Sequence, residues 1–233
     1  DIDACDRLGV TAAMKAAEGE RLEALQLLVR NGASMQRADR ESRSALSRVV
    51  DVLLRIDPMG RVSGLRSPLS GYDYWSEMAA IMVENHADIN IVDAAGDTLL
   101  CRACRRRRKD VVGTLLDHRA DVDMPVPSLK GGTVLLLAAT EGDREVCESL
   151  VARSASLNRP SATGLTPLCA AIERGYEDLA MFLVSYGAEF DKRDPRTGET
   201  LLMAAAARGL RRHYDQMLPH LAVRAVAAAQ EKA

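Results

Sequence analysis

A short phrase that recurs at nearly fixed spacing constrains the fold of this chain more than any other feature. Each copy places a hydroxyl residue before apolar and small residues, as in GGTVLLLAATEG from Gly131 and GLTPLCAAIERG from Gly164. The hydroxyl residues are separated by 33, 54, 35, 33 and 34 positions; they are Thr11, Ser44, Thr98, Thr133, Thr166 and Thr200. Such spacing predicts a repeat architecture, in which each unit buries its apolar face against its neighbours.

A second apolar phrase follows each first phrase by about twenty residues, so each unit is predicted to contain two helices. The hydroxyl residue is expected to cap the first helix, where small residues such as Ala170 and Ala171 permit close approach of the next unit. Apolar residues at three- and four-residue intervals give the second helix a stripe that faces the core. Gly32 and Gly187 are expected to end the second helix, because glycine adopts positive φ at little cost.

These phrases, above all GLTPLCAAIERGYEDLAMFLVSYGAEFD, resemble the ankyrin repeat, whose pattern runs through T-P-L-H-x-A and a closing G-A-D-V-N. The resemblance covers nearly the whole chain. It implies an all-α solenoid of about six helix-turn-helix repeats, with β-hairpin or loop fingers and inner helices that line a concave groove. We therefore expect a single domain over residues 1–233, with repeats at roughly 5–37, 38–91, 92–125, 126–159, 160–192 and 193–233.

The pattern departs from this regularity in the second repeat and at the two ends of the chain. The long interval predicts an inserted loop over residues 52–72, which contains two Pro and three Gly. Residues 193–233 are predicted to include a C-terminal capping helix, broken near Pro219. The opening letters DIDA match the end of a repeat, so we expect the chain to be a piece of a longer protein with a further repeat upstream.

Three closing glycines are replaced in the middle of the chain, by His86, Arg119 and Ser154. Each of these residues is expected to adopt a left-handed backbone conformation that costs about 1 kcal/mol. Because the stability of a solenoid is nearly a sum over neighbouring units, residues 52–155 are predicted to open more easily than the ends.

The run CRACRRRRKD is the densest cationic feature, although the formal net charge of the chain is only −2. Arg105 and Arg106 resemble ankyrin positions that project into the groove. Three interpretations stay open: a solvated run that compensates a helix dipole, a socket for an acidic or phosphorylated segment, and a nuclear-import signal. The small net charge disfavours general binding of nucleic acid.

The sequence contains no recognisable catalytic or metal-binding arrangement. Cys101 and Cys104 form a C-x-x-C pair without a second pair at metal-binding spacing, so both are interpreted as small core residues. No Ser or Cys has a matching base and acid, and no glycine-rich phosphate loop occurs. We predict no cofactor, no metal and no enzymatic activity.

The predicted function is a protein-interaction scaffold that binds a partner protein in the groove. The resemblance assigns this role to residues of the inner helices and fingers: Glu18, Arg40, Glu41, Arg105, Arg106, Lys130, Thr140, Glu141, Glu173, Arg174, Arg196, Glu199 and Arg208. Two alternatives remain: the recognition arm of a larger enzyme, such as a kinase or ubiquitin ligase, and anion or nucleic-acid binding through Arg105–Lys109. We expect no membrane insertion and a cytoplasmic location, with the nucleus as the alternative.

Overall fold

The computed structural model describes residues 1–19, 21–55 and 71–189, together with Gly198 and Met203. The chain divides into two compact units, Asp1–Ser128 and Leu129–Ala233. The expectation of one continuous domain over residues 1–233 stays a prediction. The predicted capping helix within 193–233 lies outside the described residues.

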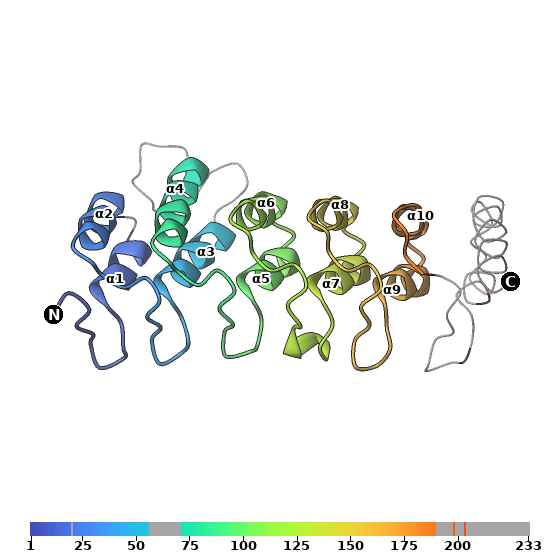
Figure 1. Cartoon of the computed structure of the whole chain (residues 1–233), viewed down its shortest axis with the longest axis horizontal. Helices are drawn as coiled ribbons and strands as arrows, with labels where there is room; N and C mark the ends of the chain where they lie inside the picture. The colour runs from blue at the N-terminus through green and yellow to red at the C-terminus, as the bar shows by residue number, and fades with distance from the viewer. Residues whose placement is uncertain (20, 56–70, 190–197, 199–202, 204–233) are drawn as a thin grey trace, which may run out of the picture. The chain divides into compact units, whose positions relative to one another are not determined.

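The first unit contains three helix pairs, each with an inner and an outer helix (Figure 1). The pairs are α1 (Ala12–Glu18) with α2 (Leu22–Arg30), α3 (Ala45–Arg55) with α4 (Gly71–Glu84), and α5 (Leu99–Arg105) with α6 (Lys109–Asp117). Inner helix α3 packs against both α1 and α5. A finger loop precedes each inner helix and is closed by one antiparallel bridge, Cys5 with Thr11, Ala38 with Ser44 and Val92 with Thr98.

The second unit repeats this arrangement over its described part. Its pairs are α7 (Val134–Glu141) with α8 (Arg144–Ala152), and α9 (Pro167–Arg174) with α10 (Glu177–Ser185). A 3-10 turn, η1 (Pro127–Leu129), spans the point in the sequence where the units divide. Among the described residues the regular structure is helical, with bridges but no extended strand, which confirms the predicted all-α solenoid class.

The described hydroxyl residues cap the inner helices as predicted, and Thr200 lies outside the described residues. The hydroxyl oxygens of Thr11, Thr98 and Thr166 accept hydrogen bonds from the backbone N–H three residues later, at 3.3, 3.1 and 3.2 Å. Thr133 and Ser44 make the same contact at 3.5 and 3.2 Å. Each cap satisfies a backbone donor that lacks a partner at a helix start, so the spacing of the hydroxyl residues sets where the inner helices begin.

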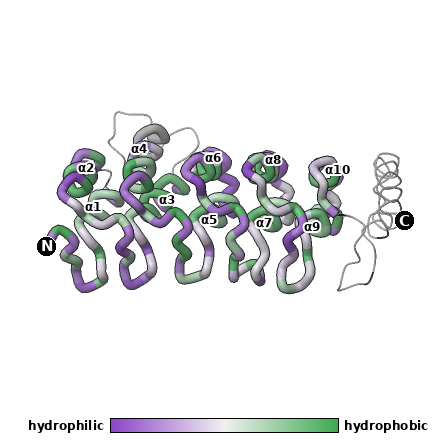
Figure 2. The backbone as a smooth tube through the Cα atoms, viewed as in Figure 1, coloured by the Kyte–Doolittle hydropathy of each residue, from purple (hydrophilic) through white to green (hydrophobic). Residues whose placement is uncertain are grey.

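Apolar residues on both helices of each pair form the core. Leu46 in α3, Leu150 in α8 and Leu168 in α9 are fully buried, as are the small residues Ala17 and Ala171. In α6 and α8 the hydrophilic residues lie on the side of the helix that faces away from its inner partner (Figure 2). These two outer helices therefore contribute one apolar stripe to the core and leave a charged stripe exposed.

A second periodic contact joins neighbouring repeats through side chains that end the preceding repeat. The side-chain oxygens of Asp3, Asn90 and Asn158 accept hydrogen bonds from the backbone N–H groups of Ser34, Asp121 and Glu189, at 2.9, 2.8 and 2.8 Å. Each bond joins residues 31 positions apart. The closing Asp or Asn of the repeat pattern thus fixes the register of the next repeat.

Both ends of the predicted inserted loop 52–72 are helical in the structure. Helix α3 continues through Arg55 and α4 begins at Gly71, so residues 52–55 and 71–72 are helical rather than part of a loop. The correction arises because Val52 and Leu53 continue the apolar stripe of α3, and Leu53 is buried. Residues 56–70 lie outside the described part of the chain.

The predicted left-handed residues are confirmed. His86, Arg119 and Ser154 have φ angles of 67°, 63° and 63°, whereas Gly32 and Gly187 have 83° and 100° at the same position of their repeats. A side chain with a Cβ is strained in this conformation, so these three repeats lack an adaptation that the first and fifth repeats possess.

We expect Ser154→Gly to raise the free energy of unfolding by about 1 kcal/mol, because glycine removes the Cβ strain of the left-handed conformation. The matched control is Gly187→Ala, which introduces a Cβ with no atom within 4 Å and so tests the backbone cost alone. The free energy of unfolding of that variant is expected to fall by about 1 kcal/mol. Urea denaturation measures both, and equal stability of all three proteins would contradict the prediction.

Candidate partner-binding surface

The predicted binding residues of the first unit lie at the ends of inner helices and on finger loops. Glu18 ends α1 and is exposed, whereas Arg105 ends α5 and Arg106 follows it, both exposed. Arg40 and Glu41 lie exposed on the second finger. The structure thus presents both predicted kinds of position on the surface of this unit.

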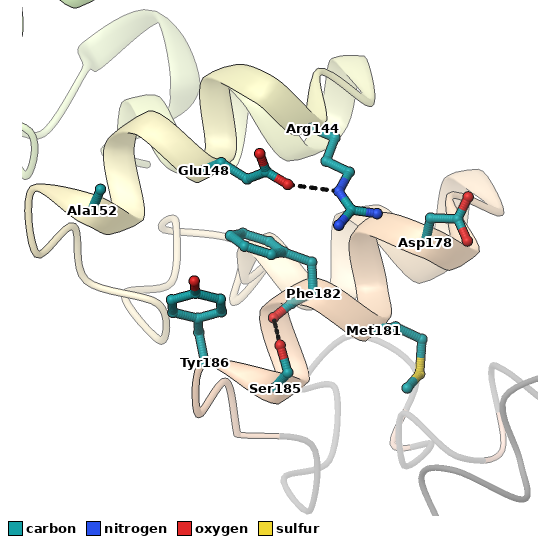
Figure 3. Close-up of a pocket in the computed structure, with 8 residues that line it drawn as sticks. All are labelled: Arg144, Glu148, Ala152, Asp178, Met181, Phe182, Ser185 and Tyr186. Carbon is teal, nitrogen blue, oxygen red and sulfur yellow. Dashed lines mark hydrogen bonds and ion pairs between the residues drawn. The ribbon is translucent and has the colours of Figure 1, made fainter.

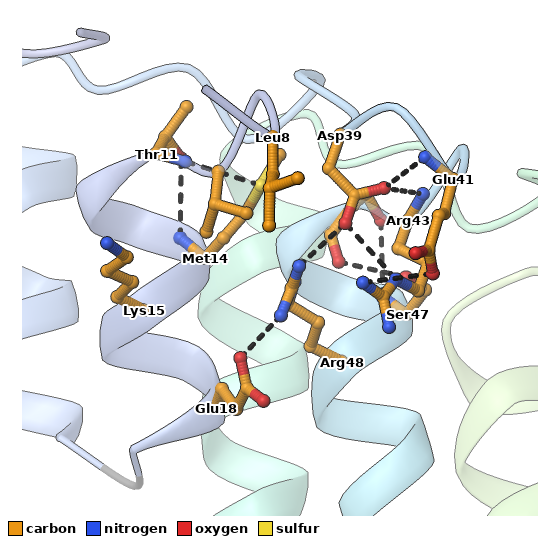
Figure 4. A network of polar contacts seen from close by, with 12 residues as sticks. Leu8, Thr11, Met14, Lys15, Glu18, Asp39, Glu41, Arg43, Ser47 and Arg48 are labelled. Atoms are coloured by element: carbon orange, nitrogen blue, oxygen red, sulfur yellow. Dashed lines mark hydrogen bonds and ion pairs between the residues drawn. The ribbon is translucent and has the colours of Figure 1, made fainter. Parts of the chain in front are cut away.

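A buried arginine that the sequence analysis did not select links two of these positions. The Arg48 side chain in α3 is only 7% exposed and pairs with the carboxylates of Glu18 and Asp39, the latter at 2.6 Å (Figure 4). Asp39 belongs to the finger of the second repeat, and its side chain is 2% exposed. Arg48 therefore fixes the end of α1 relative to the second finger.

Asp39 also orders its own finger. Its Oδ1 atom accepts hydrogen bonds from the backbone N–H groups of Glu41 and Arg43, at 2.8 and 2.9 Å. Burial alone would raise the pKa of Asp39, but these two N–H groups and the Arg48 and Arg43 guanidinium groups outweigh burial and hold its pKa below the ordinary value. The carboxylate is therefore charged in the folded protein at neutral pH.

The third repeat contains an equivalent ion-pair network. Arg102 in α5 pairs with Asp51 of α3 and lies 3.9 Å from the carboxylate of Asp93 in its own finger. Asp93 accepts hydrogen bonds from the backbone N–H groups of Ala95 and Asp97, as Asp39 does in its finger. In both networks, an arginine of an inner helix pairs with one acidic residue of the preceding inner helix and with one acidic residue of the finger in its own repeat.

One signal in the sequence could have predicted these networks. An aspartate lies five residues before each hydroxyl cap and a basic residue four residues after it, in the pairs Asp6 with Lys15, Asp39 with Arg48, and Asp93 with Arg102. The first of these pairs is also an ion pair, at 3.2 Å. The fourth and fifth repeats have Leu137 and Ala170 at the basic position, so the pattern is confined to the first unit.

The side chains of the cationic run 105–109 differ in how far they are buried. Arg105 donates to Asp97 at 3.0 Å and to the hydroxyl of Ser128 at 2.9 Å. Arg108 is buried, pairs with Asp110 at 2.6 Å and donates to the carbonyl of Leu53 near the end of α3. Arg108 is therefore not an exposed member of the cationic run, because a buried guanidinium requires its partners from within the fold. Arg106, Arg107 and Lys109 are exposed.

Backbone hydrogen bonds connect neighbouring fingers. The N–H of Arg40 donates to the carbonyl of Leu8 at 3.1 Å in the first unit, and the N–H of Ala162 donates to the carbonyl of Lys130 at 2.8 Å in the second. Leu8 is 63% exposed. The first two fingers are therefore ordered relative to each other and present an apolar side chain to solvent.

The predicted residues of the second unit occupy corresponding places. Glu141 ends α7 and is exposed, and Arg174 ends α9 and is exposed, whereas Thr140 and Glu173 are half-buried. Thr140 donates its hydroxyl to the carbonyl of Leu136 at 2.8 Å. Lys130 lies exposed on a finger with φ of 53°. The last predicted residues, Arg196, Glu199 and Arg208, lie outside the described residues.

Helix pairs joined by fingers, capped by a recurring threonine and closed by a left-handed residue, agree with a match to the family model of ankyrin repeats. That model matches residues 72–161 and 135–222, which together are more than half of the chain. The chain belongs to the ankyrin-repeat family. The structure shows that similar helix pairs precede the matched region. The pair α1 with α2 and helix α3 lie before residue 72, and α4 begins at its edge.

Several curated proteins share these ankyrin repeats. YahD of Escherichia coli (strain K12), an ankyrin repeat protein by name, is 27% identical over 193 residues, 81% of this chain and 85% of YahD. The B-cell lymphoma 3 protein homolog of Mus musculus is 28% identical over 58% of this chain, and the tyrosine-protein kinase HTK16 of Hydra vulgaris is 30% identical over 48%. These matches span only 30% and 15% of the two longer relatives.

Ankyrin repeats are in general protein-interaction modules and are typically non-catalytic. The match to HTK16 lies on the repeats, so it is no evidence about kinase activity in this chain. The absence of enzymatic activity and the alternative of a recognition arm both stay predictions. Within the described ranges, no helix is long and apolar enough to cross a membrane, and no group of His, Cys, Asp and Glu side chains could hold a metal ion.

Most cysteines of this ankyrin chain are buried, including Cys101 and Cys104, which were predicted to be core residues. Four of the five thiols are buried, and only Cys5 is exposed. Burial, reinforced by the nearby charge of Asp97, raises the pKa of Cys101 to about 12. Burial likewise raises the pKa of Cys147 to about 12. The thiolate is the reactive form, so these two residues are chemically inert in the folded protein.

We expect iodoacetamide at neutral pH to alkylate the native protein about once per chain, at Cys5, because the other four thiols are buried. Intact mass and peptide mapping measure the stoichiometry and the position. The denatured protein is the control and should be alkylated at all five cysteines. Native modification of Cys101 as fast as Cys5 would show that the first unit is more open than the structure indicates.

Proposed function

We propose that the chain binds a partner protein through the finger loops and inner-helix ends of its first unit. Exposure of Leu8 on an ordered finger carries the proposal, because an apolar side chain on a rigid surface contributes affinity without a large ordering cost. Charged residues of both signs are also exposed in the first unit, Arg40 and Glu41 on the second finger and Glu18 at the end of α1. Mixed charges favour a partner segment with its own charge pattern.

The ion pairs of Arg48 and Arg102 support this proposal. They hold the inner helices and fingers of the first unit in one arrangement, which is the preorganisation that a binding surface requires. They also remove two arginines from the set available to a partner. Arg106, which is exposed after the end of α5, is then the cation best placed to meet an acidic or phosphorylated group.

The second unit is proposed to carry a surface of the same kind, with Glu141 and Arg174 exposed at its own inner-helix ends. An intracellular location agrees with five free cysteines, because oxidising compartments favour disulfides. The partner groove of the family, the cytoplasmic location and the acidic character of the partner are parts of the proposal.

A comparison of two surface variants in quantitative crosslinking from lysate tests the proposed surface. The first variant carries Leu8→Ser and Arg106→Glu. The second carries Leu27→Ser and Arg30→Glu on the outer helix α2, and it is a matched control because Leu27 and Leu8 are both 63% exposed. We expect the first variant to lose a specific partner by about tenfold, whereas the control retains it. Equal retention or equal loss in two folded variants would reject the finger surface.

A further inference from the structure

The outer helices of the second unit border an open cavity that the proposed binding surface does not include. The cavity has a volume of about 770 Å³ and lies between α8 and α10 (Figure 3). Arg144, Glu148 and Ala152 line it from α8, and Asp178 and Phe182 line it from α10 together with Tyr186, which follows that helix. This volume falls within the range of pockets that bind small ligands or side chains.

Two aromatic rings form one wall of the cavity. The ring centroids of Phe182 and Tyr186 are 4.6 Å apart with an angle of 44° between the planes. Phe182 is only 9% exposed, whereas Tyr186 is 60% exposed. The hydroxyl of Tyr186 has no hydrogen-bond partner among the described residues, as Figure 3 illustrates. A large aromatic side chain with an open face and an unused hydroxyl is typical of a contact residue.

The cavity already binds one guanidinium group of the chain itself. Arg144 lies over the Phe182 ring, with its central carbon 5.7 Å from the ring centroid, and its Nε donates to Glu148 at 2.8 Å. The side chain thus lies against an aromatic face and pairs with a carboxylate at the same time. This is the arrangement in which aromatic rings and acids bind guanidinium groups in proteins.

The charge of the lining leaves room for a second cation. Two acids, Glu148 and Asp178, and one base, Arg144, line the cavity. Asp178 acts on Arg144 through its charge, and its carboxylate accepts no hydrogen bond within the described part of the chain. Glu145 and Glu177 add acidic charge to the first turns of α8 and α10. The exposed side of this helix pair is therefore complementary to a basic segment.

We propose that this cavity binds an arginine side chain of a partner protein, with the guanidinium over the open face of Tyr186 and the acids Glu148 and Asp178 as counter-charges. Arginine fits better than lysine, because its planar group both stacks on a ring and donates in parallel to a carboxylate. Its aliphatic stem would lie against Ala152 and the edge of Phe182. The site lies on outer helices and is independent of the finger surface.

The test uses the full chain and the probe N-acetyl-arginine amide, with N-acetyl-glutamate amide and N-acetyl-norleucine amide as comparison probes. Amide chemical shifts in two-dimensional NMR report where each probe binds. We expect the arginine probe, at a millimolar dissociation constant, to shift the amides of Ala152, Ser185 and Tyr186. Tyr186→Ala and Glu148→Gln should each weaken binding by about threefold to fivefold.

Glu145→Gln is the matched control, because it removes one acid from the same helix without changing the cavity lining. We expect it to weaken binding by less than about twofold. Equal weakening by Glu145→Gln and Glu148→Gln would show non-specific attraction and overturn the proposal. Shifts at the same amides with the glutamate probe, or with the norleucine probe at equal affinity, would overturn it as well. So would the absence of shifts with the arginine probe.

Discussion

Arg48→Met is expected to lower the free energy of unfolding by about 3 kcal/mol, because it leaves the buried carboxylate of Asp39 without its closest cation. The side chains of Arg48 and Asp39 are 7% and 2% exposed and lie 2.6 Å apart. Methionine keeps most of the volume of the arginine stem, so the loss reports the charge rather than a cavity. Urea denaturation monitored by circular dichroism measures it.

Arg43→Met provides the matched control. Arg43 pairs with the same carboxylate at 3.1 Å, but its side chain is 38% exposed. Exposed ion pairs contribute little, so we expect this variant to lose less than about 1 kcal/mol. Adding Asp39→Asn to Arg48→Met should recover part of the loss, because the neutral amide no longer buries an unpaired charge. Equal losses in the two single variants would refute the assignment of Arg48 as the principal partner.

The same pair predicts the direction of the response to acid. The pKa of Asp39 is lower in the folded than in the unfolded chain, so the unfolded state binds its proton first as pH falls. The contribution of Asp39 to stability is therefore complete above its unfolded pKa, about 3.9, and is lost as pH falls through its lower folded pKa. In Arg48→Met the pKa of Asp39 in the folded protein should rise. The difference in free energy of unfolding between this variant and wild type should therefore become smaller below about pH 4.

Leu168→Ala is expected to destabilise the second unit by about 3 kcal/mol. Leu168 lies in α9 and is fully buried, and α9 packs against both α7 and α10. Truncation removes apolar burial and leaves a cavity that the surrounding helices fill only in part. Thermal unfolding measures the total loss of stability. The control Leu168→Met nearly conserves the side-chain volume, so its free energy of unfolding should fall by less than about 1.5 kcal/mol.

Hydrogen exchange locates this effect within the chain. Because repeats interact mainly with their neighbours, peptides from α7 and α9 should exchange faster in Leu168→Ala, while peptides from α1 change least. The reciprocal variant is Leu46→Ala in α3, which occupies the corresponding helix position in the first unit and is also fully buried. A uniform increase across the chain in both variants would instead show that the described repeats unfold as one cooperative body.

Local features of the fold could be predicted from the sequence because they depend on residues close together in the chain. A threonine reaches the backbone N–H three residues later, so the caps at Thr98 and Thr166 follow from the spacing alone. Left-handed φ angles at His86 and Ser154 follow in the same way from the place of each residue in its repeat. The buried positions of Cys101 and Cys104 follow from alignment with apolar residues of other repeats.

The candidate site was predicted only in part, because charge pairing depends on contacts between repeats. Arg105 and Arg106 are exposed at the end of α5 as predicted, but Arg108 in the same run is buried against Leu53 and Asp110. The sequence offers no local reason for this difference. It arises because the end of α3 packs against the start of α6. This packing places the carbonyl of Leu53 beside the guanidinium of Arg108, a contact that only the tertiary structure reveals.

The sequence by itself determined the ankyrin family, where the described inner helices begin and which residues end the described outer helices. Only the tertiary structure decided which charges serve stability and which remain for a partner, since Glu18 and Arg48 are 30 residues apart and meet across two repeats. It also decided that Phe182 and Tyr186 share a cavity with Arg144 of the preceding repeat. The helices and their caps depend on residues close together in the sequence. Burial and ion pairing depend on residues of different repeats, which come close together only when the chain folds.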